Sequence, residues 1–222
     1  TGHREPHAIL LIFKDNQRTA SGNEYNELVF VQPRDAFREM WTGVRLGAEG
    51  AKSKLKLNQS FSNADFKAYN IDFGKFDEIL FFDFKNDVRD TNDPGDLYDL
   101  IADFKQKVNY DQLKLNIEPQ RNNLNVVDLT QIMRDLRGIK TPEELNLLKK
   151  AVDISCIGQV EVMKAMKPGM SEREIQGIHE FVFRKYESEY QGYPSIVGAG
   201  NNGCILHYID NYTPKISSKE MF

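Results

Sequence analysis

The segment 193–211 combines residue types that suit a binding or catalytic loop. It reads YPSIVGAGNNGCILHYIDN, and its central run 198–203 holds three glycines and two asparagines. Glycine and asparagine adopt positive φ at low cost, so this run predicts a tight turn. His207 follows shortly after the turn, and an imidazole can donate or accept a hydrogen bond in a cleft.

Apolar residues on either side of the turn predict a β-hairpin. Ile196 and Val197 form the expected first strand, and residues 204–206 form the second, which delivers His207 and Tyr208 at its exit. Such a hairpin would aim the imidazole into a cleft. A histidine at a strand end can also simply bond to backbone, and the residues by themselves favour this simpler interpretation.

Two other groups of potential metal ligands are interpreted as structural. Residues 83–96 carry five aspartates. Lys85 and Arg89 are interspersed and nothing fixes a ligand spacing, so a solvated loop is expected. Cys156 and Cys204 are too few for a disulfide framework. Apolar neighbours flank both, which predicts small core residues and not metal ligands.

The composition is that of an ordinary globular protein. The chain has 222 residues, of which 40% are hydrophobic and 28% charged. A net charge of −4 and an isoelectric point near 5.7 argue against nucleic acid as a partner. No apolar run reaches the length that spans a bilayer, so no membrane association is expected. No secretory signal pattern is present and cysteines are few, which favours a cytoplasmic location.

Strands and helices alternate in the first half, which predicts a small α/β domain. Strands are expected at 8–13, 27–32, 79–82 and 113–117, and helices at 34–40, 48–55 and 94–108. The polar stretch 14–26 is expected to be the loop of a hairpin between the first two strands. Asp93 is the expected N-cap of the last helix, with Pro94 at its first position.

The second half is predicted to be mainly helical. A helix is expected at 127–136, and Thr141 with Glu144 forms a capping box that starts a long helix. Ser171 with Glu174 forms a second box. An apolar stripe follows the first box at Leu145, Leu148, Val152, Ile154, Ile157, Val160, Met163 and Met166.

Several segments resemble the Xaa-Pro aminopeptidase (aminopeptidase P) family. The segment 193–211 and the run RDAFREMWTG at 34–43 carry the most specific likeness, and TGHREP at 1–6 is also similar. The runs RGIKTPEE at 137–144 and KPGMSERE at 167–174 look like the first helix starts of the family's pita-bread catalytic domain. The resemblance covers nearly the whole chain.

The resemblance implies an α/β (α+β) fold with two incomplete domains. A creatinase-like N-terminal domain is expected at 1–126, a linking helix and connector at 127–140, and the first helices and strands of a pita-bread domain at 141–222. We expect the chain to be a fragment truncated at both ends.

The resemblance also implies a metallopeptidase activity. Family members release the N-terminal residue from peptides with proline in second position, using water activated by two metal ions, usually Mn²⁺. The family's Asp, His and Glu ligands lie in later strands of the pita-bread domain, past Phe222. This chain is therefore expected to contain no metal ligand and to be inactive alone. A homo-oligomer, dimer or tetramer, is expected for the full-length protein.

Two residues are expected in the substrate site. His207 matches the family histidine that lines the pocket beside the metals, where it would bond the scissile carbonyl or stabilise the oxyanion. Trp41, the only tryptophan, either anchors the core of its own domain or, as in the family, reaches toward the active site of a neighbouring subunit. Tyr208 and Asn211 also follow the family motif, and either could support the site from behind.

Two alternative functions remain open at this point. A prolidase would cleave only Xaa-Pro dipeptides, and a metal-free pita-bread domain would bind partners without catalysis. The intact motif around His207 and the acidic composition favour the aminopeptidase over the binding module.

Overall fold

The computed structural model describes residues 2–19, 21–82, 84, 87–110 and 123–212. Two compact units divide the chain, Thr1–Arg134 and Asp135–Phe222, and each is considered by itself. The predicted strand at 113–117 lies outside the described residues. The predicted domain bounds near 126 and 141 stay a proposal.

Unit 1 is built around a small mixed sheet. Strands β1 (Ile9–Arg18) and β2 (Glu24–Val31) form the expected antiparallel hairpin, and β3 (Gln59–Ser62) pairs in parallel with β2. The strands extend into the polar stretch that was expected to be loop. Arg18 and Glu24 face each other across this extension and form an ion pair of 3.0 Å, which supports a solvent-exposed ribbon.

The other elements of unit 1 are short, apart from one helix. They are α1 (Ala36–Thr42), α2 (Gly47–Leu55), η1 (Asn63–Asp65), η2 (Phe73–Lys75), β4 (Ile79–Leu80), α3 (Leu97–Val108) and β5 (Leu124–Asn125). Strands β4 and β5 pair in parallel as a separate two-stranded ladder. Neither β3 nor β5 was expected, because their short sequences, QSFS and LN, contain no apolar run.

The second half of the central strand β2, residues 28–31, is buried on both faces. Leu28 and Phe30 belong to an aromatic core that includes buried residues of α3, whereas Val29 and Val31 pack with Ala51 of α2. Alternate residues of a strand point to opposite faces, so one short apolar run supplies both cores. This explains why the run reads as uniformly apolar.

The start of α3 differs from the prediction. Asp96 is the N-cap, since its carboxylate accepts from the Asp99 amide at 2.9 Å, and it is 2% exposed. Thr91 donates to the same carboxylate through its amide and its hydroxyl. Asp93 instead pairs with Arg38 of α1 through two contacts of 2.6 and 2.7 Å. The expectation of a fully solvated acidic loop was therefore wrong for this part of 83–96.

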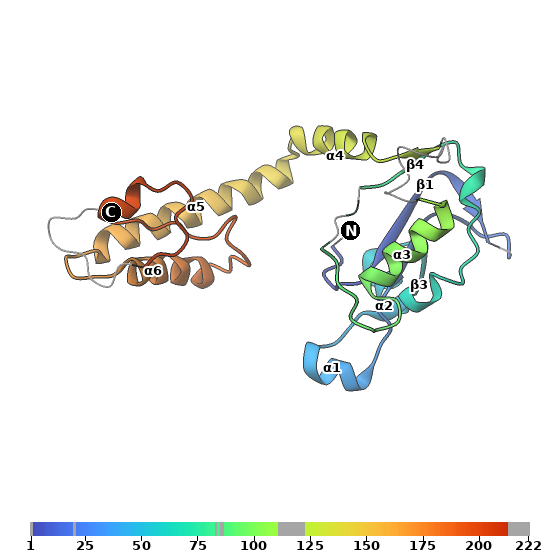
Figure 1. Ribbon diagram of the computed structural model, residues 1–222, viewed down its shortest axis with the longest axis horizontal. Coiled ribbons are helices and arrows are strands. Elements are labelled where there is room, and N and C mark those ends of the chain that lie inside the picture. The colour runs from blue at the N-terminus through green and yellow to red at the C-terminus, as the bar shows by residue number, and fades with distance from the viewer. Residues whose placement is uncertain (1, 20, 83, 85–86, 111–122, 213–222) are drawn as a thin grey trace. The chain divides into compact units, whose positions relative to one another are not determined.

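Unit 2 contains two paired helices, α5 (Pro142–Ala165) and α6 (Glu172–Lys185), that lie side by side (Figure 1). Helix α4 (Asp128–Gly138) runs across the boundary between the units. Both predicted capping boxes are confirmed, at Thr141 and at Ser171. These boxes satisfy amides that the first helical turn leaves unpaired.

A glycine sets the contact between α5 and α6. The buried residues of α5 are Ile154, Gly158 and Val162, which recur every four positions. A Cβ added at Gly158 would lie 2.5 Å from Cδ2 of His179, so the imidazole occupies the space that a side chain would need. Most of the predicted apolar stripe is exposed in this unit: Leu145, Leu148, Val152, Val160, Met163 and Met166. Cys156 is also exposed, which contradicts its assignment to the core.

Candidate functional site

The His207 segment, defined here as residues 195–212, does not contain the predicted hairpin. Its only described regular element is the 3-10 helix η4 (Gly200–Cys204), and Cys204 is exposed instead of buried. The amides of Asn202 and Ile205 bond to carbonyls three residues earlier, not across a strand pair. Gly198 packs so closely on the turn that an added Cβ would lie 2.8 Å from the Gly203 nitrogen. The absence of a side chain at Gly198 therefore allows the two sides of this turn to pack closely together.

His207 is exposed and has an unusual backbone conformation. Its φ is 59°, in the left-handed region that costs an L-residue roughly 1–2 kcal/mol, and Asn211 follows with φ of 46°. Residues held in this region persist where their surroundings fix them, and they concentrate at functional sites. Two buried side chains, Tyr208 and Asn211, provide that fixation on the C-terminal side of His207.

The first anchor joins Tyr208 to Glu172 at the start of α6. The Tyr208 hydroxyl donates to Oε2 of Glu172 at 2.9 Å and accepts from the Tyr212 amide at 2.9 Å. Oε1 of Glu172 accepts from the Ala199 amide at 2.7 Å and from Nδ2 of Asn202 at 3.0 Å. One carboxylate thus holds both sides of the turn.

The second anchor joins Asn211 to the beginning of the segment. Its Oδ1 accepts from the Val197 amide at 2.8 Å, and its Nδ2 donates to the Ser195 carbonyl at 2.8 Å. Nδ2 also donates to Oε1 of Gln176 on α6 at 2.9 Å. Asn211 is 2% exposed, so these contacts are shielded from water.

One face of α6 carries both anchors. Glu172, Gln176 and Glu180, here called the α6 polar ladder, are spaced four residues apart and so line one side of the helix. Glu180 accepts from the Ser195 hydroxyl at 2.8 Å and from Gln176 at 2.7 Å. The ladder thus bonds to the His207 segment on three successive turns.

The electrostatics favour the protonation states that these bonds need. Burial raises the pKa of the Tyr208 phenol above its usual value, and the neighbouring Glu172 carboxylate acts in the same direction. Tyr208 therefore stays a donor to Glu172 at neutral pH. Glu172 lies in the first turn of α6, where the positive end of the helix dipole favours a negative charge.

Trp41 belongs to the other unit and is not part of a core. It lies on α1 and is 79% exposed, so the interpretation as a core anchor is wrong. Phe37, Met40 and Val44 beside it are each at least 68% exposed and form an apolar surface. The interpretation that Trp41 contacts a neighbouring subunit stays a prediction.

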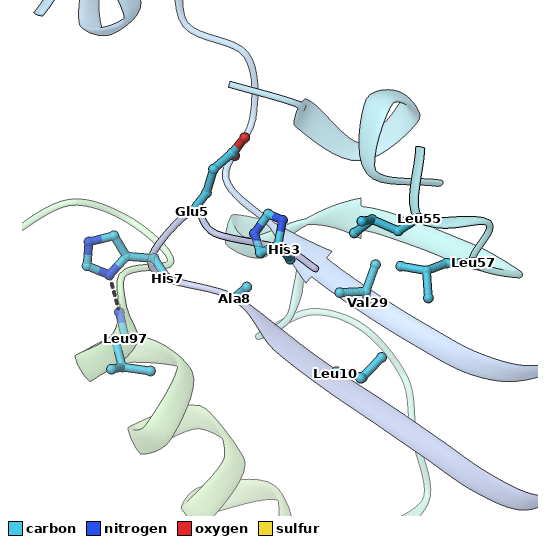
Figure 2. Close-up of a pocket in the computed structure, with 9 residues that line it drawn as sticks. All are labelled: His3, Glu5, His7, Ala8, Leu10, Val29, Leu55, Leu57 and Leu97. Carbon is cyan, nitrogen blue, oxygen red and sulfur yellow. Dashed lines mark hydrogen bonds between the residues drawn. The ribbon is translucent and has the colours of Figure 1, made fainter. Parts of the chain in front are cut away.

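Unit 1 also contains a cavity of about 330 Å³ that includes neither predicted site residue. Its polar lining comes from His3, Glu5 and His7, and its apolar lining from Ala8, Leu10, Val29, Leu55, Leu57 and Leu97. Figure 2 shows His7 turned toward Leu97, whose amide donates to Nδ1 of His7 at 2.9 Å. Glu5 accepts from the Leu46 amide at 2.7 Å. Glu5 and His7 are therefore used to hold the backbone of other segments.

Within the described part of the chain, no group of three His, Cys, Asp or Glu residues could hold a metal ion. The described residues thus do not provide a dimetal site. None of the described helices combines the length and apolar character needed to cross a membrane.

Models of two known protein families match the chain, one in each unit. A model of the aminopeptidase P N-terminal domain matches residues 1–78, and one of metallopeptidase family M24 matches residues 146–222. The chain is therefore similar to the aminopeptidase P family in both of its units. It is mixed α/β, with the N-terminal domain followed by the start of the M24 domain, a family that implies a divalent metal.

Relatives of the family cover the chain almost completely. An Xaa-Pro aminopeptidase of Haemophilus influenzae is 30% identical over 216 residues, covering 96% of this chain and 43% of that protein. One of Escherichia coli is 28% identical over 220 residues, covering 95% and 44%. The chain therefore spans less than half the length of these relatives.

Solved structures show the same fold. Proline aminopeptidase P II from Yersinia pestis matches with a TM-score of 0.73 and 24% identity, covering 99% of this chain and 47% of that one. Pseudomonas aeruginosa aminopeptidase PepP matches with a TM-score of 0.75 and 25% identity, covering 99% and 46%.

Sequence reasoning identified His207, Tyr208 and Asn211 but missed Glu172 and Gln176. An acidic residue in the first turn of a helix ordinarily faces solvent, so Glu172 gave no signal of burial. The four-residue spacing of Glu172, Gln176 and Glu180 places them on one face of α6, and this pattern could have revealed them. If another segment packs on that face, these polar side chains need hydrogen-bond partners there.

Proposed function

We propose that a protein carrying this chain together with the rest of its relatives' length is a metal-dependent Xaa-Pro aminopeptidase. It would release the N-terminal residue from peptides with proline in second position. The observation that carries the proposal is the exposed His207, whose left-handed backbone within the matched M24 region is followed by two buried anchors, Tyr208 and Asn211.

The proposed role of His207 is to stabilise developing charge on the substrate. Its imidazole would donate a hydrogen bond to the scissile carbonyl oxygen, which gains negative charge as water attacks. A donor fixed in advance costs no reorganisation during the reaction, and removing one such donor typically lowers kcat by roughly 10²–10³-fold. The buried anchors Tyr208 and Asn211 hold the backbone that carries this donor.

The metal requirement forms part of the proposal. We propose two Mn²⁺ ions, which would activate the attacking water, bound by residues outside the described part of this chain. The 222-residue chain alone is proposed to bind no catalytic metal and to cleave nothing. A cytoplasmic location and a homo-oligomer are also proposed, and Trp41 on α1 would contact substrate in a neighbouring subunit.

A peptide panel tests the activity and separates it from prolidase. The full-length protein with Mn²⁺ is offered Xaa-Pro-Yaa tripeptides, matched Xaa-Ala-Yaa tripeptides and Xaa-Pro dipeptides. Cleavage of the proline tripeptides over the alanine ones supports the proposal. Cleavage of dipeptides alone would identify a prolidase, and no cleavage together with no metal uptake would identify a binding module.

The same assay tests the proposals about Trp41 and the isolated chain. Trp41→Ala should raise KM for the tripeptides if the indole contacts substrate, and light scattering should show an oligomer. An unchanged KM, or a monomer with full activity, would refute the role across subunits. Turnover by the 222-residue chain alone, with tightly bound Mn²⁺, would refute its proposed inactivity.

A further inference from the structure

We propose that Glu172 is a positioning residue for His207, acting through Tyr208 and the turn at Ala199–Asn202. This inference rests on the proposed function, because it assigns to Glu172 the task of holding the imidazole where substrate would meet it. Glu172 itself is fully buried and would touch no substrate.

The burial of Glu172 is the first observation. The residue is 0% exposed, and a carboxylate is rarely fully buried unless its oxygens are bonded. Oε1 accepts from the Ala199 amide and from Asn202, and Oε2 accepts from Tyr208. The carboxylate therefore bonds directly to residues on both sides of the turn. Ala199 and Asn202 lie eight and five residues before His207, and Tyr208 directly follows it.

The saturation of the Tyr208 hydroxyl is the second observation. The oxygen donates to Glu172 and accepts from Nδ2 of Asn202 at 3.0 Å and from the Tyr212 amide. A hydroxyl has one donor and two acceptor positions, so all three are used. Because Tyr208 directly follows His207, fixing the phenol restrains the left-handed backbone of His207.

This pattern of donors makes the carboxylate specifically necessary. Every group that faces Glu172 in the described contacts is a donor, so both of its oxygens must accept. In Glu172→Gln the amide oxygen can replace Oε1, but its NH₂ group then faces the Tyr208 hydroxyl. That hydroxyl has lost its acceptor and has no free lone pair, so two donors oppose each other beside His207.

A double-mutant cycle in the full-length protein tests the positioning role. Glu172→Gln is measured alone and together with His207→Asn, which removes the imidazole but keeps a residue that tolerates the left-handed region. Glu172→Gln alone should lower kcat by about tenfold or more while KM changes less than about twofold, since misplacing a catalytic group costs rate. In the His207→Asn background the same change should cost less than about twofold, because no imidazole remains to be positioned.

The matched control is Glu143→Gln. Glu143 is an exposed acid in the first turn of α5, so the change removes the same charge from the same kind of helix start. It should leave kcat unchanged. Equal losses of kcat from Glu172→Gln with and without His207 would overturn the proposal, because they would indicate a general structural role.

Hydrogen exchange on the 222-residue chain gives a readout that does not need activity. The amides of Ala199 and Tyr212 bond to Glu172 and Tyr208, so Glu172→Gln should lower their protection by about tenfold or more, whereas Glu143→Gln should not. Unchanged protection would overturn the positioning role whatever the activity. Lost protection in a protein that cleaves no Xaa-Pro peptide would refute the proposed function, and it would leave Glu172 as the residue that fixes the turn.

Discussion

Asn211 is predicted to contribute more to the order of the His207 segment than its exposed neighbours on the same turn. Asn211→Ala removes the acceptor of the Val197 amide and the donor to Ser195 and Gln176. These bonds contribute about 1 kcal/mol each. Alanine also tolerates the left-handed φ of 46° less well, at a cost of about 1 kcal/mol. The free energy of local opening should therefore fall by about 4 kcal/mol.

Hydrogen exchange at the Val197 amide measures this loss directly. A tenfold change corresponds to about 1.4 kcal/mol, so protection should fall by at least about a hundredfold in Asn211→Ala. Asn211→Gly should lose less, because glycine adopts positive φ without the Cβ penalty. Asn201→Ala, at an exposed position of η4, is the control and should leave Val197 protected. Fluorescence of Trp41 is unsuitable because the indole lies in the other unit.

The result that would refute this reasoning is a fall in Val197 protection of less than about threefold in Asn211→Ala. Equal loss of protection in Asn201→Ala would refute it as well. Either outcome would mean that the bonds of Asn211 do not hold the segment, and that the left-handed backbone near His207 is stable without them.

Two further predictions concern stability. Gly158→Ala should destabilise the chain by about 1–3 kcal/mol through the clash with His179, whereas Gly177→Ala, with no atom within 4 Å, should stabilise α6 by up to about 1 kcal/mol. Urea unfolding followed by circular dichroism should show changes of opposite sign in the free energy of unfolding of the two variants. Changes of the same sign would contradict the packing argument. The hydrogen bond and the charge of Arg38 hold the pKa of Asp93 in the folded state below its ordinary value. The ion pair therefore contributes its full stability above about pH 4, and this contribution is lost as the pH falls through the lowered pKa of the folded state. In Asp93→Asn the free energy of unfolding should fall less steeply as the pH is lowered below about 4. An unchanged pH dependence would contradict the stabilising role given to the ion pair of Asp93 with Arg38.

The helices of the second half could be predicted because their signals are local. Thr141 and Ser171 each precede a glutamate by three residues, and the resulting bonds form within one turn regardless of the rest of the fold. The hairpin of β1 and β2 was predictable for a similar reason, since apolar runs flank a polar stretch. Its length was not, because the pairing of Arg18 with Glu24 depends on register.

The misses arose where tertiary contacts decide between local alternatives. Asp93 and Asp96 are both plausible N-caps, and the ion pair with Arg38, fifty-five residues away in sequence, occupies Asp93. Ile196 and Val197 have the residue types of a strand, but Asn211 takes the Val197 amide that a ladder would need. Such choices depend on a partner that a short window of sequence does not contain.

The turnover number of His207→Asn in the full-length protein tests the central claim most directly. The account predicts that kcat for an Xaa-Pro tripeptide falls by about 10²–10³-fold, with KM nearly unchanged and the fold intact by circular dichroism. An unchanged kcat would contradict it, because the exposed imidazole of His207, which directly precedes the anchored Tyr208, would then have no part in catalysis.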